Sequence, residues 1–186
     1  NIESIESKIS NLLIKKFEGN QVKINWIGGE DQSSLVLGNG RPFFAKILNP
    51  KKRNRILRKS SNLEGISLSE LRKILVQPKG SIPFKSKVSI IVDTEKPILL
   101  THLKKLDVLE NVKIHDPSKD KKNLNKQIYQ IRYKKLAKTS FRLDLLADGG
   151  IPIKFFIQSS DVTPNVSELL QNSCHCRKID FKNIII

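Results

Sequence analysis

Strand-like and helix-like segments are interspersed along this chain without a regular strand–helix–strand rhythm. Apolar residues alternate with polar ones over 22–27, and similar strand patterns cover 41–48, 85–92 and 126–135. Residues 2–17 instead carry apolar side chains at helical spacing. Because an α/β fold would alternate the two kinds of segment regularly, the pattern predicts an α+β fold with a mixed, mostly antiparallel central sheet.

The other segments extend this pattern. It predicts further strands and one long exposed loop, namely strands over 97–100, 139–147, 151–157 and 177–186 and the loop over 113–126. Asp148-Gly149-Gly150 is predicted to be a hairpin turn between two of these strands. Ser67-Leu68-Ser69-Glu70 has capping-box spacing, which predicts a helix to about Val76. Thr163-Pro164 predicts the start of a short helix.

The chain is strongly basic. It has 186 residues and a formal net charge of +16, with 34 Lys and Arg against 18 Asp and Glu. Such an excess favours a polyanionic partner, with nucleic acid ahead of an anionic membrane surface or a merely solvated lysine-rich surface. No apolar run is as long as a membrane span, and the start does not resemble a signal peptide. We therefore expect an RNA partner, no membrane partner and a cytoplasmic location.

The basic residues gather in two regions. Residues 51–59 hold six bases and no acid, and the second cluster lies within 119–138. The predicted RNA-binding residues are Lys51, Lys52, Arg53, Arg55, Arg41, Lys134 and Lys135.

The two cysteines do not predict a metal site. Cys174 and Cys176 flank His175, but a tetrahedral site needs four ligands and the sequence has no second Cys/His pair. The simpler interpretation is two small side chains on one face of a strand, as free thiols in a reducing compartment. We predict no metal and no cofactor.

A carboxylate stands in a glycine-rich turn between two predicted strands. The stretch runs Gly28-Gly29-Glu30-Asp31 and, after six residues, reaches Gly38-Asn39-Gly40-Arg41-Pro42-Phe43. Taken alone, Asp31 would be interpreted as a residue that caps a solvated turn.

This stretch resembles the catalytic segment of the archaeal-type tRNA pseudouridine synthases that modify the T-loop, the Pus-ten family. Three later segments are similar to further family motifs and follow in the same order, at Lys126-Gln127-Ile128-Tyr129, at 149–156 and at 163–170. The resemblance covers about residues 21–186. It predicts a pseudouridine-synthase-type catalytic domain over 21–186, and the helical spacing at the start of the chain makes 1–20 an N-terminal helical segment.

The resemblance implies an isomerase that converts uridine to pseudouridine in the T-loop of tRNA, at position 54, position 55 or both. It makes Asp31 the essential carboxylate and Tyr129 the aromatic that stacks on the uracil and assists proton removal. Lys154 becomes the cation that pairs with Asp31. From the residues alone, Tyr129 would equally be a core aromatic on the same strand face as Tyr133, and Lys154 an edge-strand lysine with partly buried neighbours.

Several positions depart from the family pattern. Gly29 replaces an arginine, Ser33 and Leu35 remove charge near Asp31, and Lys46 stands where the family usually has Glu. The family's large N-terminal RNA-binding domain is not in this sequence, so a separate RNA-docking domain or subunit is a possible partner. The alternative function is a catalytically impaired RNA-binding protein on the synthase fold.

Overall fold

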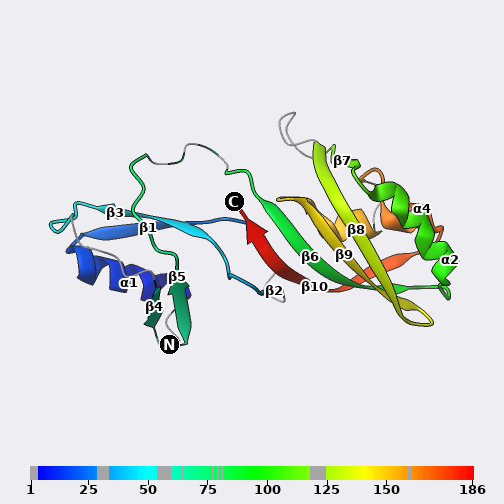
Figure 1. Ribbon diagram of the computed structural model, residues 1–186, viewed down its shortest axis with the longest axis horizontal. Coiled ribbons are helices and arrows are strands. Elements are labelled where there is room, and N and C mark those ends of the chain that lie inside the picture. The colour runs from blue at the N-terminus through cyan, green and yellow to red at the C-terminus, as the bar shows by residue number, and fades with distance from the viewer. Residues whose placement is uncertain are drawn as a thin grey trace. The chain divides into compact units, whose positions relative to one another are not determined.

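The computed structural model describes residues 4–28, 34–53, 60–63, 65–76, 78, 80, 82–117, 125–158 and 161–186. They form two compact units, one comprising Asn1–Ile27 with Arg41–Ile82 and the other Gly28–Gly40 with Pro83–Ile186. The elements of both units are labelled in Figure 1. Each unit is described by itself, and the predicted division into 1–20 and 21–186 stays a prediction.

The first unit is a helix packed on a two-stranded sheet. Helix α1 (Ile5–Phe17) begins where the Ser4 hydroxyl accepts a hydrogen bond from Ser7 N at 3.1 Å, and it ends at Glu18 in the left-handed conformation. Its buried side chains pack against the antiparallel pair of β1 (Gln21–Trp26) and β3 (Phe43–Leu48). The predicted helix over 2–17 and the first two predicted strands are confirmed.

The predicted helix over 67–76 is wrong. Ser67 and Ser69 lie in β5 (Ile66–Ser69), which pairs in antiparallel register with β4 (Ser60–Leu63). Residues 71–76 are described and form neither helix nor strand, and Leu75 is 94% exposed. Apolar residues at helical spacing follow the capping box, but pairing of β5 with β4 and burial of Leu68 prevail over this local pattern.

The second unit contains a six-stranded sheet. Its spatial order is β2 (Leu35–Val36), β10 (Cys174–Ile185), β6 (Lys85–Thr94), β9 (Ser140–Asp148), β8 (Asn125–Ala137) and β7 (Lys113–His115). Among these described strands, β2 and β10 are parallel and the other neighbouring pairs are antiparallel. The prediction of an α+β fold with a mixed, mostly antiparallel sheet is therefore confirmed.

Four short helices complete the core on one face of this sheet (Figure 1). They are α2 (Leu100–Leu103), the 3-10 helix η1 (Lys104–Leu109), α3 (Ile153–Gln158) and α4 (Val166–Leu170). The strands predicted over 97–100 and 151–157 are thus wrong, because these segments lead into α2 and form α3. The predicted exposed loop over 113–126 is also wrong at both ends, where β7 pairs with β8, and its residues 118–124 lie outside the described part of the chain.

Helix α4 confirms the short helix predicted after Thr163-Pro164, but its cap is a different residue. Asn165 is the N-cap, and its side chain accepts a hydrogen bond from Glu168 N at 2.9 Å. The helix thereby begins two residues later than a threonine cap would place it.

A β-bulge in β8 separates the two tyrosines. Pairing of β8 with β9 shifts register between Ile128 and Gln130, so Ile128, Ile131 and Tyr133 face the core while Tyr129 turns to the other face. In a regular strand, residues four apart would share a face. The expectation that Tyr129 and Tyr133 lie on the same face is therefore wrong.

Candidate active site

A small cavity opens where the glycine-rich turn meets the end of the sheet. Its lining combines Gly28, the ends of β6 and β9 and the start of α3, through Phe84, Ser86, Val88, Leu145, Ala147, Asp148, Gly150, Ile151, Ile153, Phe181 and Ile184. Gly28 has φ +79°, a conformation that glycine adopts without strain. The lining is mainly apolar, with Asp148 as its charged member.

Tyr129 is held by this lining. Its hydroxyl donates a hydrogen bond to Asp148 Oδ1 at 2.9 Å, and the Gln127 backbone N–H donates to Asp148 Oδ2, also at 2.9 Å. Lys85 places its Nζ 3.8 Å from the centroid of the Tyr129 ring, a cation–π contact. The β-bulge thus gives Tyr129 a fixed hydroxyl direction on the face of the sheet opposite the helices.

Lys154 belongs to helix α3, on the other side of the sheet. The sequence predicted it in a partly buried strand, but it lies in a helix and its side chain is exposed. Burial raises the pKa of the Cys176 thiol, and the nearby Lys154 ammonium opposes part of that increase. Lys154 is therefore within electrostatic range of β10, directly after Ile153 of the cavity lining.

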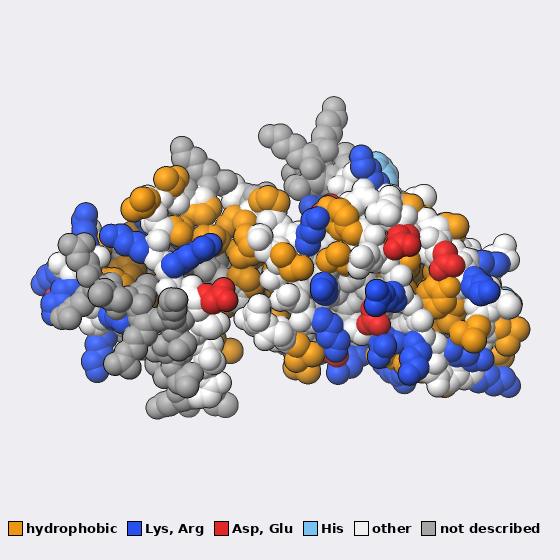
Figure 2. Space-filling view, viewed as in Figure 1, with side chains coloured by type: hydrophobic (Ala, Val, Ile, Leu, Met, Phe, Trp, Pro, Cys, Tyr) orange, Lys and Arg blue, Asp and Glu red, His pale blue; other side chains and the backbone are white. Residues whose placement is uncertain are grey.

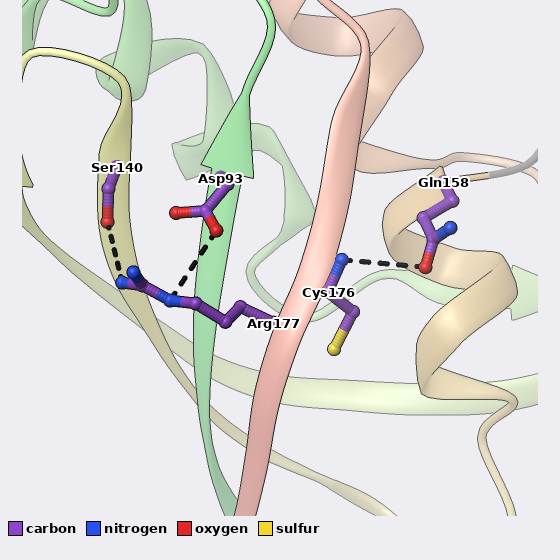
Figure 3. A network of polar contacts seen from close by, with 5 residues as sticks. All are labelled: Asp93, Ser140, Gln158, Cys176 and Arg177. Carbon is purple, nitrogen blue, oxygen red and sulfur yellow. Dashed lines mark hydrogen bonds and ion pairs between the residues drawn. The ribbon is translucent and has the colours of Figure 1, made fainter.

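Helix α3 is tied to β10 at a second β-bulge. Pairing of β10 with β6 shifts register between Cys176 and Lys178, and Gln158 Oε1 accepts a hydrogen bond from Cys176 N at 3.4 Å. The next residue, Arg177, points the opposite way across β6 (Figure 3). Its Nε lies 3.4 Å from Asp93 Oδ2, and its Nη2 donates to Ser140 Oγ at 3.3 Å. The Gln158–Cys176 hydrogen bond holds the helix that carries Lys154 on β10, and the Arg177 contacts join β10 to β6 and β9.

Asp31 and Arg55 lie outside the described residues. The described flanks of the Asp31 segment both belong to the second unit: Gly28 lines the cavity, and Ser34 leads into β2. Their roles stay predictions, as do those of Tyr129 and Lys154.

The comparisons with known proteins identify the family. The family model described as "Pus10, C-terminal" matches residues 1–184. The chain belongs to the Pus10 C-terminal family. This confirms the resemblance found in the four sequence motifs.

Curated relatives agree with this family. A protein of Nitrosopumilus maritimus named "tRNA pseudouridine synthase Pus10" is 42% identical over 182 residues, which are 98% of this chain and 48% of the relative. One of the same name from Cenarchaeum symbiosum is 31% identical over 185 residues, 98% of this chain and 45% of the relative. The chain therefore spans about half the length of these Pus10 relatives.

A solved structure supports the fold. The archaeal box H/ACA sRNP Nop10–Cbf5 complex contains a chain that matches 94% of this one, with a TM-score of 0.52 and 8% identity. The match covers 42% of that chain. At this identity the likeness supports the fold of the Pus10 C-terminal chain and nothing about its chemistry.

The predicted RNA-binding lysines and arginines are divided between the two units. In the first unit, Lys51 and Arg53 are exposed, and Lys52 forms an ion pair with Glu18. In the second unit, Lys134 is exposed and Lys135 is half-buried on β8. Figure 2 shows Lys and Arg side chains gathered over the strands of this unit, with a few acidic ones between them.

Arg41, in the family's Gly-Asn-Gly-Arg-Pro-Phe block, takes part in local structure. Its Nε donates to Ile27 O at 3.3 Å, and its guanidinium carbon lies 5.4 Å from the centroid of the Trp26 ring. The turn backbone and an aromatic ring therefore hold the side chain in the first unit.

Sequence reasoning missed Asp148 and Lys85. Asp148 was interpreted only as a turn residue and Lys85 only as the start of a strand, although both contact Tyr129. The signal that could have found them is register: the two residues are paired across β6 and β9.

No metal site or membrane helix is found in the described part of the chain. Its His, Cys, Asp and Glu residues form no group of three that could hold a metal ion, and no described helix is long and apolar enough to cross a membrane. Cys174 and Cys176 have free thiols on β10.

Proposed function

We propose that this chain is the catalytic part of a tRNA pseudouridine synthase. It isomerises uridine to pseudouridine in the T-loop of tRNA, at position 54, position 55 or both. The proposal rests on the family and on the names of its relatives. It requires RNA contacts by Arg41, Lys134, Lys135 and the basic residues of 51–55.

The structural observation that carries the proposal is that two family motifs, far apart in sequence, line the Gly28 cavity, and a third contacts its lining. Gly28 precedes the Asp31 segment, Asp148 holds the Tyr129 hydroxyl, and Ile153 precedes Lys154. Functional sites commonly gather residues from several elements at one concave point. This convergence favours a reaction centre at the cavity over a set of unrelated structural residues.

The chemistry divides among the three residues as follows. The Asp31 carboxylate attacks C1′ or acts as a base at the sugar, and the N1–C1′ bond breaks. The freed uracil stacks on Tyr129 and turns. Its C5 then forms a bond to C1′ while the Asp31–C1′ bond breaks or, where Asp31 acted as a base, the proton returns to the sugar. C5 then loses its proton and N1 gains one, so the product is an isomer of the substrate. Lys154 supplies positive charge that favours the ionised form of Asp31.

The test is a modification assay on unmodified tRNA transcripts with wild type, Asp31→Asn and Asp107→Asn. Asp107 lies on η1 and bonds Tyr133 on the core face, so its variant is a matched charge control. We expect wild type and Asp107→Asn to form pseudouridine, and Asp31→Asn to lose turnover while retaining RNA binding. Equal product from wild type and Asp31→Asn would remove Asp31 from the mechanism.

The alternative, an RNA-binding protein with impaired catalysis, has its own outcome in this assay. Lys154 is exposed on α3 while Tyr129 lies on the opposite face of the sheet, and this separation favours weak positioning. RNA binding by a wild-type chain that forms no pseudouridine in any transcript would establish the alternative.

A further inference from the structure

Asp148 contacts β8 through both of its carboxylate oxygens. Oδ1 accepts the hydroxyl proton of Tyr129 and Oδ2 accepts the backbone N–H of Gln127, each at 2.9 Å. The carboxylate is half-buried and lines the Gly28 cavity. Two hydrogen bonds therefore position the Asp148 side chain, and one of its oxygens accepts the Tyr129 hydroxyl.

This geometry limits what the Tyr129 hydroxyl can do. A neutral phenol that donates its proton to Asp148 has only its oxygen lone pairs left to face a substrate. The hydroxyl can accept a proton from a bound nucleobase only if it passes its own proton to Asp148 along the existing hydrogen bond. A phenol paired with a carboxylate is thus suited to relay a proton, whereas an isolated phenol is a poor base at neutral pH.

We propose that Asp148 is a positioning residue for Tyr129 and the acceptor of its phenol proton when C5 of the rotated uracil is deprotonated. The inference rests on the proposed pseudouridine synthase function. The C5–H bond breaks, its electron pair forms C5=C6, and the former C6=N1 pair takes up a proton from water at N1. The C5 proton moves to Tyr129 Oη, the phenol proton moves to Asp148 Oδ1, and water then removes it.

The same strand provides an internal control. Tyr133 also donates its hydroxyl to a carboxylate, Asp107 Oδ1, at 2.8 Å. Tyr133 packs on the core face, and Asp107 does not line the Gly28 cavity, whereas Asp148 does. Loss of the Tyr133–Asp107 bond should therefore leave the reaction unchanged, while loss of the Tyr129–Asp148 bond should slow one step.

The experiment compares single-turnover rates on tRNA transcripts that contain either uridine or 5-fluorouridine. Fluorine cannot leave C5 as a cation, so consumption of the fluorinated substrate reports steps up to C5–C1′ bond formation and not deprotonation. For Asp148→Asn we expect a rate loss of about 10²-fold on uridine, the lower range for general acid–base catalysis, with little change on 5-fluorouridine. RNA affinity should stay at the wild-type value.

A second variant covers the case that Asp148→Asn disturbs the Gln127 hydrogen bond. Tyr129→Phe keeps that bond and removes only the hydroxyl, so it should show the same selective loss on uridine. The double variant should be no slower than the slower single variant, because the two residues act as a unit. Tyr133→Phe and Asp107→Asn should match wild type on both substrates.

Three results would overturn the inference. Equal slowing on both substrates would make Asp148 a structural residue, and wild-type rates on uridine for either Asp148→Asn or Tyr129→Phe would exclude the relay. A wild-type chain that consumes neither substrate would remove the proposed function and the inference together, whereas the first two results leave the proposed function intact.

Discussion

At the scale of single residues, Gly149 is fixed by direct contact with an aromatic ring. A Cβ atom at Gly149 would come within 2.1 Å of Phe84 Cζ, and its N–H donates to Phe84 O at 2.7 Å. Gly149 follows Asp148 and precedes the turn into α3. The contact therefore fixes the backbone between the residue that holds Tyr129 and the helix that carries Lys154.

Gly149→Ala should destabilise the fold by overpacking. We expect a loss of about 1–3 kcal/mol in the free energy of unfolding, measured in urea. Phe84→Ala removes the ring, so the double variant should be less destabilised than the sum of the two single variants. Gly150→Ala is the control: its Cβ would come no closer than 3.8 Å to Lys126, and φ is +85°. The destabilisation by Gly150→Ala comes from backbone strain, which Phe84→Ala should not relieve, so these two changes should be additive. If the free-energy losses of Gly149→Ala and Phe84→Ala are also additive, the steric argument is wrong.

At the scale of elements, alternation predicted the long strands correctly. β6, β8, β9 and β10 each cross the sheet with one face in the core, so polar and apolar residues must alternate along them. The motifs in and beside these strands also made Tyr129 a candidate site residue. The bulge after Ile128 was not predicted. Strict alternation assumes that successive side chains take opposite faces, and the extra residue of a bulge breaks that rule at one point.

Short or continuous apolar segments were predicted less well. Residues 151–157 form an apolar run that suits a buried strand and a buried helix equally, and the helix placed Lys154 in an exposed position. β2 has two residues and its pairing depends on β10, far away in sequence. The contacts of Asp148 and Lys85 with Tyr129 likewise depend on sheet register, so no local pattern marks them.

The buried start of β10 should make stability depend on alkaline pH. Burial raises the pKa of the Cys174 thiol from 9.0 to about 11, and a hydrogen bond with Ser167 opposes part of this increase. The folded state therefore holds the proton more tightly than the unfolded state. Its contribution to stability is fully present below pH 9 and is lost as the pH rises to about 11.

Urea unfolding at pH 8, 9, 10 and 11 measures this effect. For wild type we expect a loss of about 2 kcal/mol between pH 9 and 11, since one pKa unit corresponds to about 1.4 kcal/mol. Cys174→Ala removes the titrating group and should show a smaller loss over the same interval. Parallel pH profiles for the two proteins would show that other groups cause the alkaline destabilisation.

At the scale of the whole molecule, positive charge is present on both units. The net charge of the whole chain is +16, and basic residues stand at 51–53 in one unit and on β6, β8 and β10 in the other. A surface of this kind binds a polyanion largely by releasing condensed counterions. The proposed tRNA substrate is such a polyanion.

RNA affinity should therefore fall steeply with salt, and the slope should identify the contributing lysines. Each phosphate contact adds about 0.7 to 0.9 to the slope of log affinity against log salt concentration. Two double variants should lower both affinity and slope in filter-binding titrations on a tRNA transcript: Lys134→Glu with Lys135→Glu, and separately Lys51→Glu with Lys52→Glu.

The control is the double variant Lys104→Glu with Lys105→Glu. It makes the same charge change at exposed positions on η1 and should alter the slope least. If all three double variants reduce the slope equally, net charge and not a defined footprint governs binding; if none does, neither basic cluster contacts the RNA backbone.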